Sequence, residues 1–147
     1  MRFWDASAIV ALCLDEDRSK QADQLLRDDT GVTAWWATPV ECASAIARAR
    51  REERLSPAAE QAALDTLDAL ASAWYEVQPG FLVRSHALRL LRVHPLRTAD
   101  ALQLAAALVW AGSPPGGAIV TLDERLGEAA RLEGLDVLPQ ADCARGI

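Results

Sequence analysis

Short apolar runs alternate with longer amphipathic stretches along the chain. Runs rich in aromatic, β-branched or aliphatic residues predict five strands, at residues 2–4, 31–35, 75–78, 118–122 and 135–138. Between them, apolar residues recur every three or four positions, which predicts helices at 6–14, 19–28, 39–54, 57–73, 81–93, 99–111 and 124–133. Because parallel strands need helical crossovers, this alternation predicts a three-layer α/β fold with helices on both faces of a parallel sheet.

Several helix boundaries are marked by residues that suit a helix end. A hydroxyl residue followed by proline, at Thr38-Pro39 and again at Ser56-Pro57, predicts a capped helix start. Thr98 is expected to cap the helix that follows it. His94-Pro95 should break the preceding helix, and Gly134 should end the one before the last strand.

Length and composition narrow the architecture further. A chain of 147 residues, 51% hydrophobic and 24% charged, fits one globular domain spanning residues 1–147. No apolar stretch has the length of a signal peptide or membrane span, so we expect a cytoplasmic protein without membrane contact. Cys13, Cys42 and Cys143 lack paired spacing and are expected to be reduced and mostly buried. His86 and His94 are expected at the surface or in turns.

Four acidic residues fall beyond the carboxyl ends of predicted strands, where open parallel sheets bind ligands. Asp5 ends the first strand and Asp123 follows the fourth. Glu41 and Asp100 lie in the first turns of helices that begin near the same edge. Taken singly, each acid also suits a structural role. Asp5 could cap the next helix and Asp123 could be a turn residue, whereas Glu41 and Asp100 could favour the positive N-terminus of a helix. Four converging carboxylates, however, would repel one another unless a cation neutralised them, and oxygen ligands favour Mg²⁺ or Mn²⁺.

Four segments that contain these acids resemble the signature blocks of the PIN-domain family and follow the family's order. They are Phe3-Trp4-Asp5-Ala6-Ser7, Pro39-Val40-Glu41, the run RTADALQLA from Arg97 to Ala105, and the run VTLDERL from Val120 to Leu126. The resemblance extends from Arg2 to Leu138. In size and single-domain layout, the chain most resembles the toxin half of a VapBC toxin–antitoxin pair. Two departures are Ala6, where a hydroxyl residue is common, and the bulky pair Trp35-Trp36.

This resemblance implies a fold, an activity and partners. The sheet should have the strand order 3-2-1-4-5, and the four acids should hold one or two ions of Mg²⁺ or Mn²⁺. The protein should be an endoribonuclease that hydrolyses RNA phosphodiester bonds by a metal-activated water. Asp5, Glu41 and Asp100 are expected at or next to the metal, and Asp123 further out or at a second ion. A cognate antitoxin and a second copy of the chain are the expected protein partners.

Three hydroxyls lie beside these acids in the sequence. Ser7, Thr98 and Thr121 are candidates to orient a carboxylate or a water at the metal, although each also suits a structural role as a cap or strand residue.

The net charge of −6 argues against a nucleic-acid partner unless positive charge gathers locally. Without the four site acids the charge is −2, and residues 81–99 hold arginines but no acid. We therefore expect RNA phosphates to bind the arginines of this stretch, although a solvated helix face is the alternative: Arg84, Arg89, Arg92 and Arg97. A second group of arginines, within residues 48–54, is partly cancelled by two glutamates.

Other features leave further hypotheses open. Of Trp35 and Trp36, one is expected in the core, while an exposed ring could stack on an unpaired base. The helices at 39–54 and 57–73 could form an apolar groove for a partner helix. A PIN module that binds RNA without cleaving it and a purely partner-binding domain are alternatives. A metal-dependent phosphatase or response-regulator fold is disfavoured because no lysine follows the fourth strand.

Overall fold

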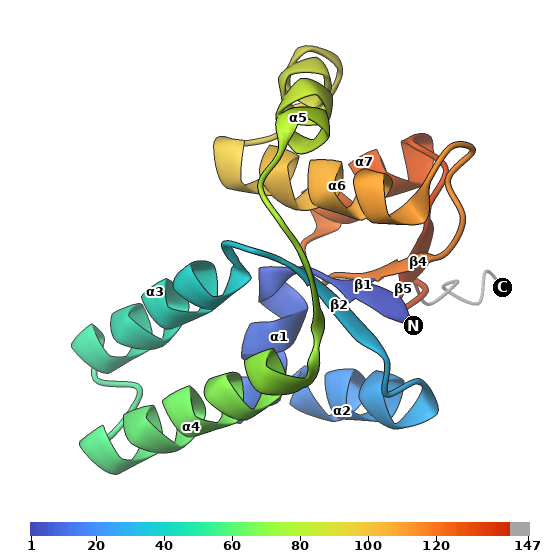
Figure 1. Ribbon diagram of the computed structural model, residues 1–147. Helices are drawn as coiled ribbons and strands as arrows, with labels where there is room; N and C mark the ends of the chain where they lie inside the picture. The colour runs from blue at the N-terminus through green and yellow to red at the C-terminus, as the bar shows by residue number, and fades with distance from the viewer. Residues whose placement is uncertain (142–147) are drawn as a thin grey trace, which may run out of the picture.

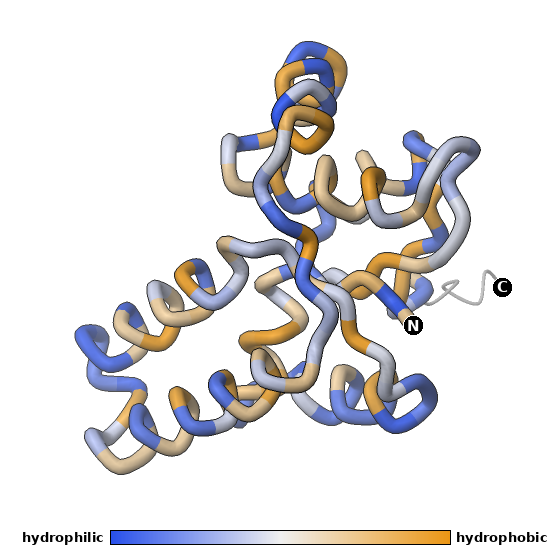
Figure 2. Tube along the Cα trace, in the orientation of Figure 1, coloured by the Kyte–Doolittle hydropathy of each residue, from blue (hydrophilic) through white to orange (hydrophobic). Residues whose placement is uncertain are grey.

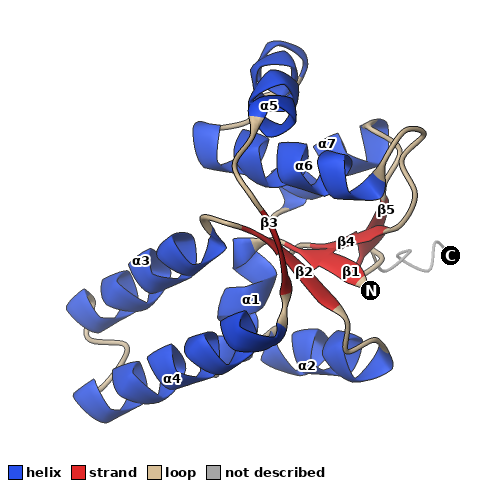
Figure 3. Ribbon diagram, in the orientation of Figure 1, coloured by secondary structure: helices blue, strands red, loops and turns tan. Residues whose placement is uncertain are grey.

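A central parallel sheet organises the residues that this computed structural model describes, 1–141. Its strands are β1 (Arg2–Trp4), β2 (Val32–Trp35), β3 (Tyr75–Val77), β4 (Ala118–Val120) and β5 (Asp136–Leu138). They pair in parallel in the order β3-β2-β1-β4-β5, which confirms the predicted order (Figure 3). Because the order reverses between β1 and β4, the edge beyond Trp4 and Val120 is the ligand-binding edge of such a sheet.

Helices cover both faces of this sheet and give the predicted three layers (Figure 1). They are α1 (Ala6–Cys13), α2 (Ser19–Asp28), α3 (Thr38–Arg51), α4 (Pro57–Ala73), α5 (Phe81–Val93), α6 (Thr98–Ala111) and α7 (Glu124–Leu132). The first four lie on one face, and α5, α6 and α7 lie on the other. Within residues 1–141, no helix is both long and apolar enough to cross a membrane.

The alternation of strand side chains divides the core in two. Phe3 and Ile119 pack with α5, α6 and α7, whereas Trp4 and Val120 pack with the helices of the other face. All four side chains are fully buried. Figure 2 shows hydrophobic residues gathered along the sheet and hydrophilic ones at the turn between α3 and α4. The central strands are thus buried on both faces, which explains their continuous apolar sequence.

Most element boundaries agree with the prediction to within one helical turn. The third helix ends at Arg51 rather than near Arg54, because Glu53 adopts a left-handed φ of 58° that turns the chain into α4. Cys13 and Cys42 are free, as expected, and Cys42 is buried. Cys143 lies outside the described residues.

Two of the three predicted hydroxyl caps are wrong. The N-caps of α3 and α6 are Ala37 and Arg97, and neither helix has a side-chain cap. Thr38 is instead buried inside the first turn of α3, where its hydroxyl has a tertiary partner described below, and Thr98 opens α6. Ser56 caps α4 as predicted, by accepting a hydrogen bond from Ala59 N at 3.1 Å.

An ion-pair network joins the ends of α5 and α7. Glu133 accepts hydrogen bonds from Arg89 Nη1 at 3.1 Å and Nη2 at 2.7 Å, and its Oε1 lies 2.7 Å from His94 Nε2. The Arg89 guanidinium holds the pKa of Glu133 below its usual range. The His94 side chain is only 6% exposed and lies in the bend that ends α5, which fits the predicted turn position rather than the surface one. Arg89 is therefore engaged in an ion pair in this fold, and its predicted contact with RNA stays a prediction.

We expect Glu133→Ala to lower the free energy of unfolding by about 1–3 kcal/mol, because it leaves His94 buried without its partner. Urea denaturation at pH 7 measures this. The loss should shrink as the pH falls, since a carboxylate with a lowered pKa contributes stability above its unfolded pKa and loses it as the pH falls through its folded pKa.

Glu128→Ala is the matched control, because Glu128 is exposed and pairs with Arg131 at 3.5 Å. It should leave the unfolding free energy nearly unchanged. Equal losses from the two substitutions would show that the network does not brace the fold.

Candidate functional site

Asp5 lies at the carboxyl end of β1, where the chain turns into α1. Its extended backbone makes it the N-cap, and its Oδ1 accepts a hydrogen bond from Ala8 N at 3.2 Å. Ser7 Oγ donates to the same oxygen at 2.6 Å, and Thr121 Oγ1 donates to Oδ2 at 2.7 Å. The residue is only 3% exposed. Asp5 is therefore both the expected cap and a buried carboxylate fixed on both oxygens.

The same two hydroxyls fix the chain that leaves β4. Leu122 N donates to Ser7 Oγ at 2.9 Å, and Asp123 N donates to Thr121 Oγ1 at 3.1 Å. Each hydroxyl thus donates to Asp5 and accepts from the backbone between β4 and α7. Ser7 and Thr121 thus orient the Asp5 carboxylate, whereas their support of a metal or a water stays a prediction. Thr98, the third hydroxyl, is exposed at the start of α6, and its role stays a prediction.

Glu41 enters the site from the first turn of α3. Its Oε1 accepts a hydrogen bond from Gln103 Nε2 at 3.1 Å. Gln103 lies on α6, three residues after Asp100, and is 2% exposed. Gln103 is absent from the predicted site, although a polar residue one turn after Asp100 on an apolar helix was a usable signal.

Asp100 and Asp123 line one cleft of about 720 Å³. Asp100 lies in the first turn of α6, and Asp123 caps α7 by accepting a hydrogen bond from Leu126 N at 2.9 Å. Arg97 and Arg125 line the same cleft, and both oppose the rise in the pKa of Asp100. Arg125 is a second residue that the sequence prediction missed.

Burial and mutual repulsion make the four acids one electrostatic group. Burial raises the pKa of Asp5 to about 6, against the opposing effect of its hydrogen bonds. Burial, and after it the charges of Asp5 and Asp100, raises the pKa of Glu41 to about 7, although the Gln103 bond lowers it. Burial and the charge of Asp123 raise the pKa of Asp100. The charges of Asp5 and Asp100 act on Glu41 and the charge of Asp123 acts on Asp100, whereas the predicted convergence of the four acids on one ion stays a prediction.

The donor set suits a hard divalent cation, although the carboxylates stand apart. Within residues 1–141, no three acidic, His or Cys side chains lie close enough to ligate one ion as they stand. A cation would have to draw the carboxylates together, and it would offset the repulsion that raises their pKa. All four groups are oxygen donors, which Mg²⁺ and Mn²⁺ prefer. The residues present therefore fit such an ion.

The arginines predicted to bind RNA do not form one surface. Arg97 lines the cleft of Asp100, whereas Arg89 and Arg92 line a separate cleft of about 550 Å³ along α5. Arg84 and Arg92 are exposed, and Arg89 is held by Glu133. Of this set, Arg97 is the arginine that lines the cleft of Asp100 and Asp123.

The tandem tryptophans at the end of β2 divide as predicted. Trp35 is buried, whereas Trp36 is 52% exposed, and the two rings meet edge to face with centroids 6.5 Å apart. A half-exposed ring near the carboxyl edge has the chemistry to stack on an unpaired base.

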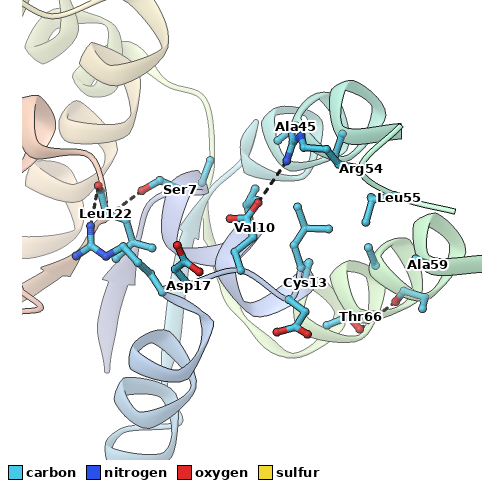
Figure 4. Close-up of a pocket in the computed structure, with 18 of the residues that line it drawn as sticks. Ser7, Val10, Cys13, Asp17, Ala45, Arg54, Leu55, Ala59, Thr66 and Leu122 are labelled. Atoms are coloured by element: carbon cyan, nitrogen blue, oxygen red, sulfur yellow. Dashed lines mark hydrogen bonds and ion pairs between the residues drawn. The ribbon is translucent and has the colours of Figure 1, made fainter. Parts of the chain in front are cut away.

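A groove of about 1090 Å³ runs between α1, α3 and α4 and reaches Glu41. Small and apolar side chains line much of it, including Val10, Cys13, Ala45 and Ala59 in Figure 4. Acidic residues 15–17 also line the groove. The apolar groove expected between the third and fourth helices is therefore present.

Comparison with known proteins identifies a family with similar sequences and structures. A family model described as PIN domain matches residues 2–132. Ribonuclease VapC45 of Mycobacterium tuberculosis is 35% identical over 141 residues, which cover 93% of this chain and 94% of the relative. The crystal structure of VapC20 from the same organism, described as a sarcin–ricin loop cleaving toxin, aligns with a TM-score of 0.66. The two sequences are 16% identical, and the alignment covers 88% of this chain and 95% of that one. A toxin–antitoxin complex from Klebsiella pneumoniae aligns with a TM-score of 0.57 and 16% identity over 84% of this chain and 87% of that one.

In EDTA, the protein is expected to lose stability as the pH rises from about 4 to about 7. Acids with a raised folded pKa contribute stability below their unfolded pKa and lose it as the pH rises through the folded pKa, about 6 for Asp5 and about 7 for Glu41. Added Mg²⁺ should restore the melting temperature at pH 8. Calorimetry across this pH range measures both effects.

Asp5→Asn should flatten this dependence, because asparagine keeps the cap and removes one titrating charge. Asp65→Asn, which alters an exposed acid of α4, should follow the parent curve. If Asp5→Asn instead destabilises the protein at every pH in EDTA, Asp5 is a structural cap alone.

Proposed function

This chain belongs to the PIN domain family, and we propose that it is a metal-dependent endoribonuclease that hydrolyses RNA phosphodiester bonds. One observation carries the proposal: the four acids of the family-like blocks form one electrostatic group of oxygen donors at the carboxyl edge of the sheet. VapC45, with 35% identity over nearly the whole chain, is named a ribonuclease, which supports the same class of reaction here.

Each site residue has a proposed part in this reaction. Asp5, Glu41 and Asp100 would hold the ion, Mg²⁺ or Mn²⁺, with Asp123 further out or at a second ion. The bound ion would supply an activated water and offset charge on the phosphate, from which the 3′ oxygen leaves in line. Ser7 and Thr121 hold the Asp5 carboxylate against rotation.

RNA is proposed to cross the cleft that Arg97, Arg125, Asp100 and Asp123 line. Arginines on both flanks of a metal site can hold the phosphates on either side of the scissile bond. Arg84 and Arg92 stay proposed contacts further along α5, whereas the pairing of Arg89 with Glu133 argues against a phosphate there.

The groove reaching Glu41 is the proposed binding site of a cognate antitoxin, which would make this chain the toxin of a type II toxin–antitoxin pair. The structural neighbour from Klebsiella pneumoniae is described as a toxin–antitoxin complex, and this supports the same kind of partner. An amphipathic helix fits the apolar groove between α3 and α4. Because acidic residues 15–17 also line the groove, the partner helix should carry basic residues.

A homodimer that acts in the cytosol completes the proposal. Large apolar side chains are exposed along α5, and burying them against a second copy would remove them from water. They are Phe81, Leu82, Leu88, Leu91 and Val93.

The purified protein is expected to cleave single-stranded RNA with Mg²⁺ or Mn²⁺ and to stop in EDTA, because the acids alone supply no activated water. Asp5→Asn and Asp100→Asn should each lower the cleavage rate by about 100-fold or more. Gel analysis of a labelled RNA measures these rates. Asp65→Asn should cleave like the parent, and full activity in EDTA, or binding of RNA without any cleavage in either metal, would contradict the proposal.

Arg97→Ala is expected to weaken RNA binding and to flatten its log-log salt dependence by about one unit, since one phosphate contact is lost. Fluorescence anisotropy on the non-cleaving Asp5→Asn background measures binding over a range of salt concentrations. Arg92→Ala is the comparison, because Arg92 lies on the separate cleft of α5. An unchanged salt slope in Arg97→Ala together with a reduced one in Arg92→Ala would move the RNA path onto α5.

A further inference from the structure

Gln103 is a buried amide whose presence core packing does not explain. The other buried residues of α6 are alanines and leucines. The Gln103 side chain is buried with them, and its Oε1 has no hydrogen-bond partner. An unpaired buried acceptor costs free energy that leucine or methionine at the same position would not cost. A helix face selected only for stability would therefore not carry glutamine here.

The donor half of the amide is fully used. One bond runs from Nε2 to Thr38 Oγ1 at 3.0 Å, and the other runs to Glu41 Oε1 at 3.1 Å. Thr38 is itself fully buried in the first turn of α3. Because Thr38 fixes the plane of the amide, the second N–H is directed at Glu41.

Glu41 is the site carboxylate that most needs such a contact. The charges of Asp5 and Asp100 both repel it, and its side chain lines the open groove into which it could swing. Asp5, in contrast, accepts three hydrogen bonds, from Ser7, Ala8 and Thr121, on its own side of the site. The bond from Gln103 opposes the repulsion and keeps the Glu41 carboxylate toward the other acids.

We propose that Gln103 is a positioning residue that holds Glu41 where the cation binds, with Thr38 as the anchor of its amide. The inference rests on the proposed metal-dependent function. Asp100 and Gln103 lie one turn apart on α6, so one helix supplies both a metal-binding acid and the contact that places another. Since α3 and α6 cover opposite faces of the sheet, this contact also links the two layers at the site.

The test compares Gln103→Met, which keeps the length of the side chain and removes its donor, with the parent full-length protein. Calorimetric titration with Mn²⁺ alone should give a dissociation constant raised by about 10-fold or more. The kcat for RNA cleavage should fall by a similar factor while KM stays unchanged, because Gln103 does not touch RNA. Stability in EDTA should change little, because the substitution removes the unpaired acceptor but also leaves the buried Thr38 hydroxyl without its partner.

Two further variants make the result specific. Thr33→Val is the control: it removes a buried hydroxyl of β2 that, like the Gln103 carbonyl oxygen, has no hydrogen-bond partner. This variant should leave the Mn²⁺ affinity and the kcat at parent values. Thr38→Val leaves the bond to Glu41 but frees the amide, so it should weaken Mn²⁺ binding less than Gln103→Met. If Gln103→Met fails to fold, Thr38→Val decides the question.

Parent-like Mn²⁺ affinity and kcat in Gln103→Met, with only the unfolding free energy lowered, would overturn the inference and make Gln103 a structural link between α3 and α6. Failure of the parent protein itself to bind Mn²⁺ or to cleave RNA would overturn the proposed function and this inference with it. The first result leaves the proposed function standing, so the two failures are distinguishable.

Discussion

Negative charge held away from water at one edge of the sheet is the constraint on which the rest of this structure depends. Four carboxylates lie near the ends of β1 and β4, where burial raises the pKa of Asp5, Glu41 and Asp100 and the charges of neighbouring acids raise the pKa of Glu41 and Asp100 further. Hydrogen bonds from two hydroxyls to Asp5 and from one amide to Glu41 offset part of this unfavourable free energy. A bound divalent cation would offset the rest. The same features that make the edge unfavourable without an ion would favour the binding of one.

The sheet and its two cores bring together acids from separate layers. Glu41 comes from α3 on one face and Asp100 comes from α6 on the other, while Asp5 follows a central strand buried between them. A shift of either layer would separate the carboxylates, so the packing of Phe3 and Trp4 on opposite faces also sets the geometry of the site. Stability and function are linked through the same central strands.

The site opens in two directions of different chemistry. Glu41 borders an apolar groove with acidic residues 15–17 along it, whereas Asp100 and Asp123 border a cleft with Arg97 and Arg125. An amphipathic basic helix suits the first and a phosphate backbone suits the second. A partner in the groove would lie against Glu41, so occupation of the groove and the chemistry of the acids would be coupled through that residue.

Local signals in the sequence determined the elements, their three-layer arrangement, and the positions of Asp5 and Asp123 at strand ends, because periodicity and strand-end residues act over a few neighbouring positions. The resemblance to a family supplied the strand order. Tertiary structure alone decided which distant side chains meet. The Gln103 amide binds Glu41, which lies 62 positions away in the sequence, Arg89 forms an ion pair with Glu133, and Thr38 binds Gln103 instead of capping α3. Such pairings depend on how helices that are distant in the sequence pack against one another. The spacing of residues along one helix does not determine that geometry.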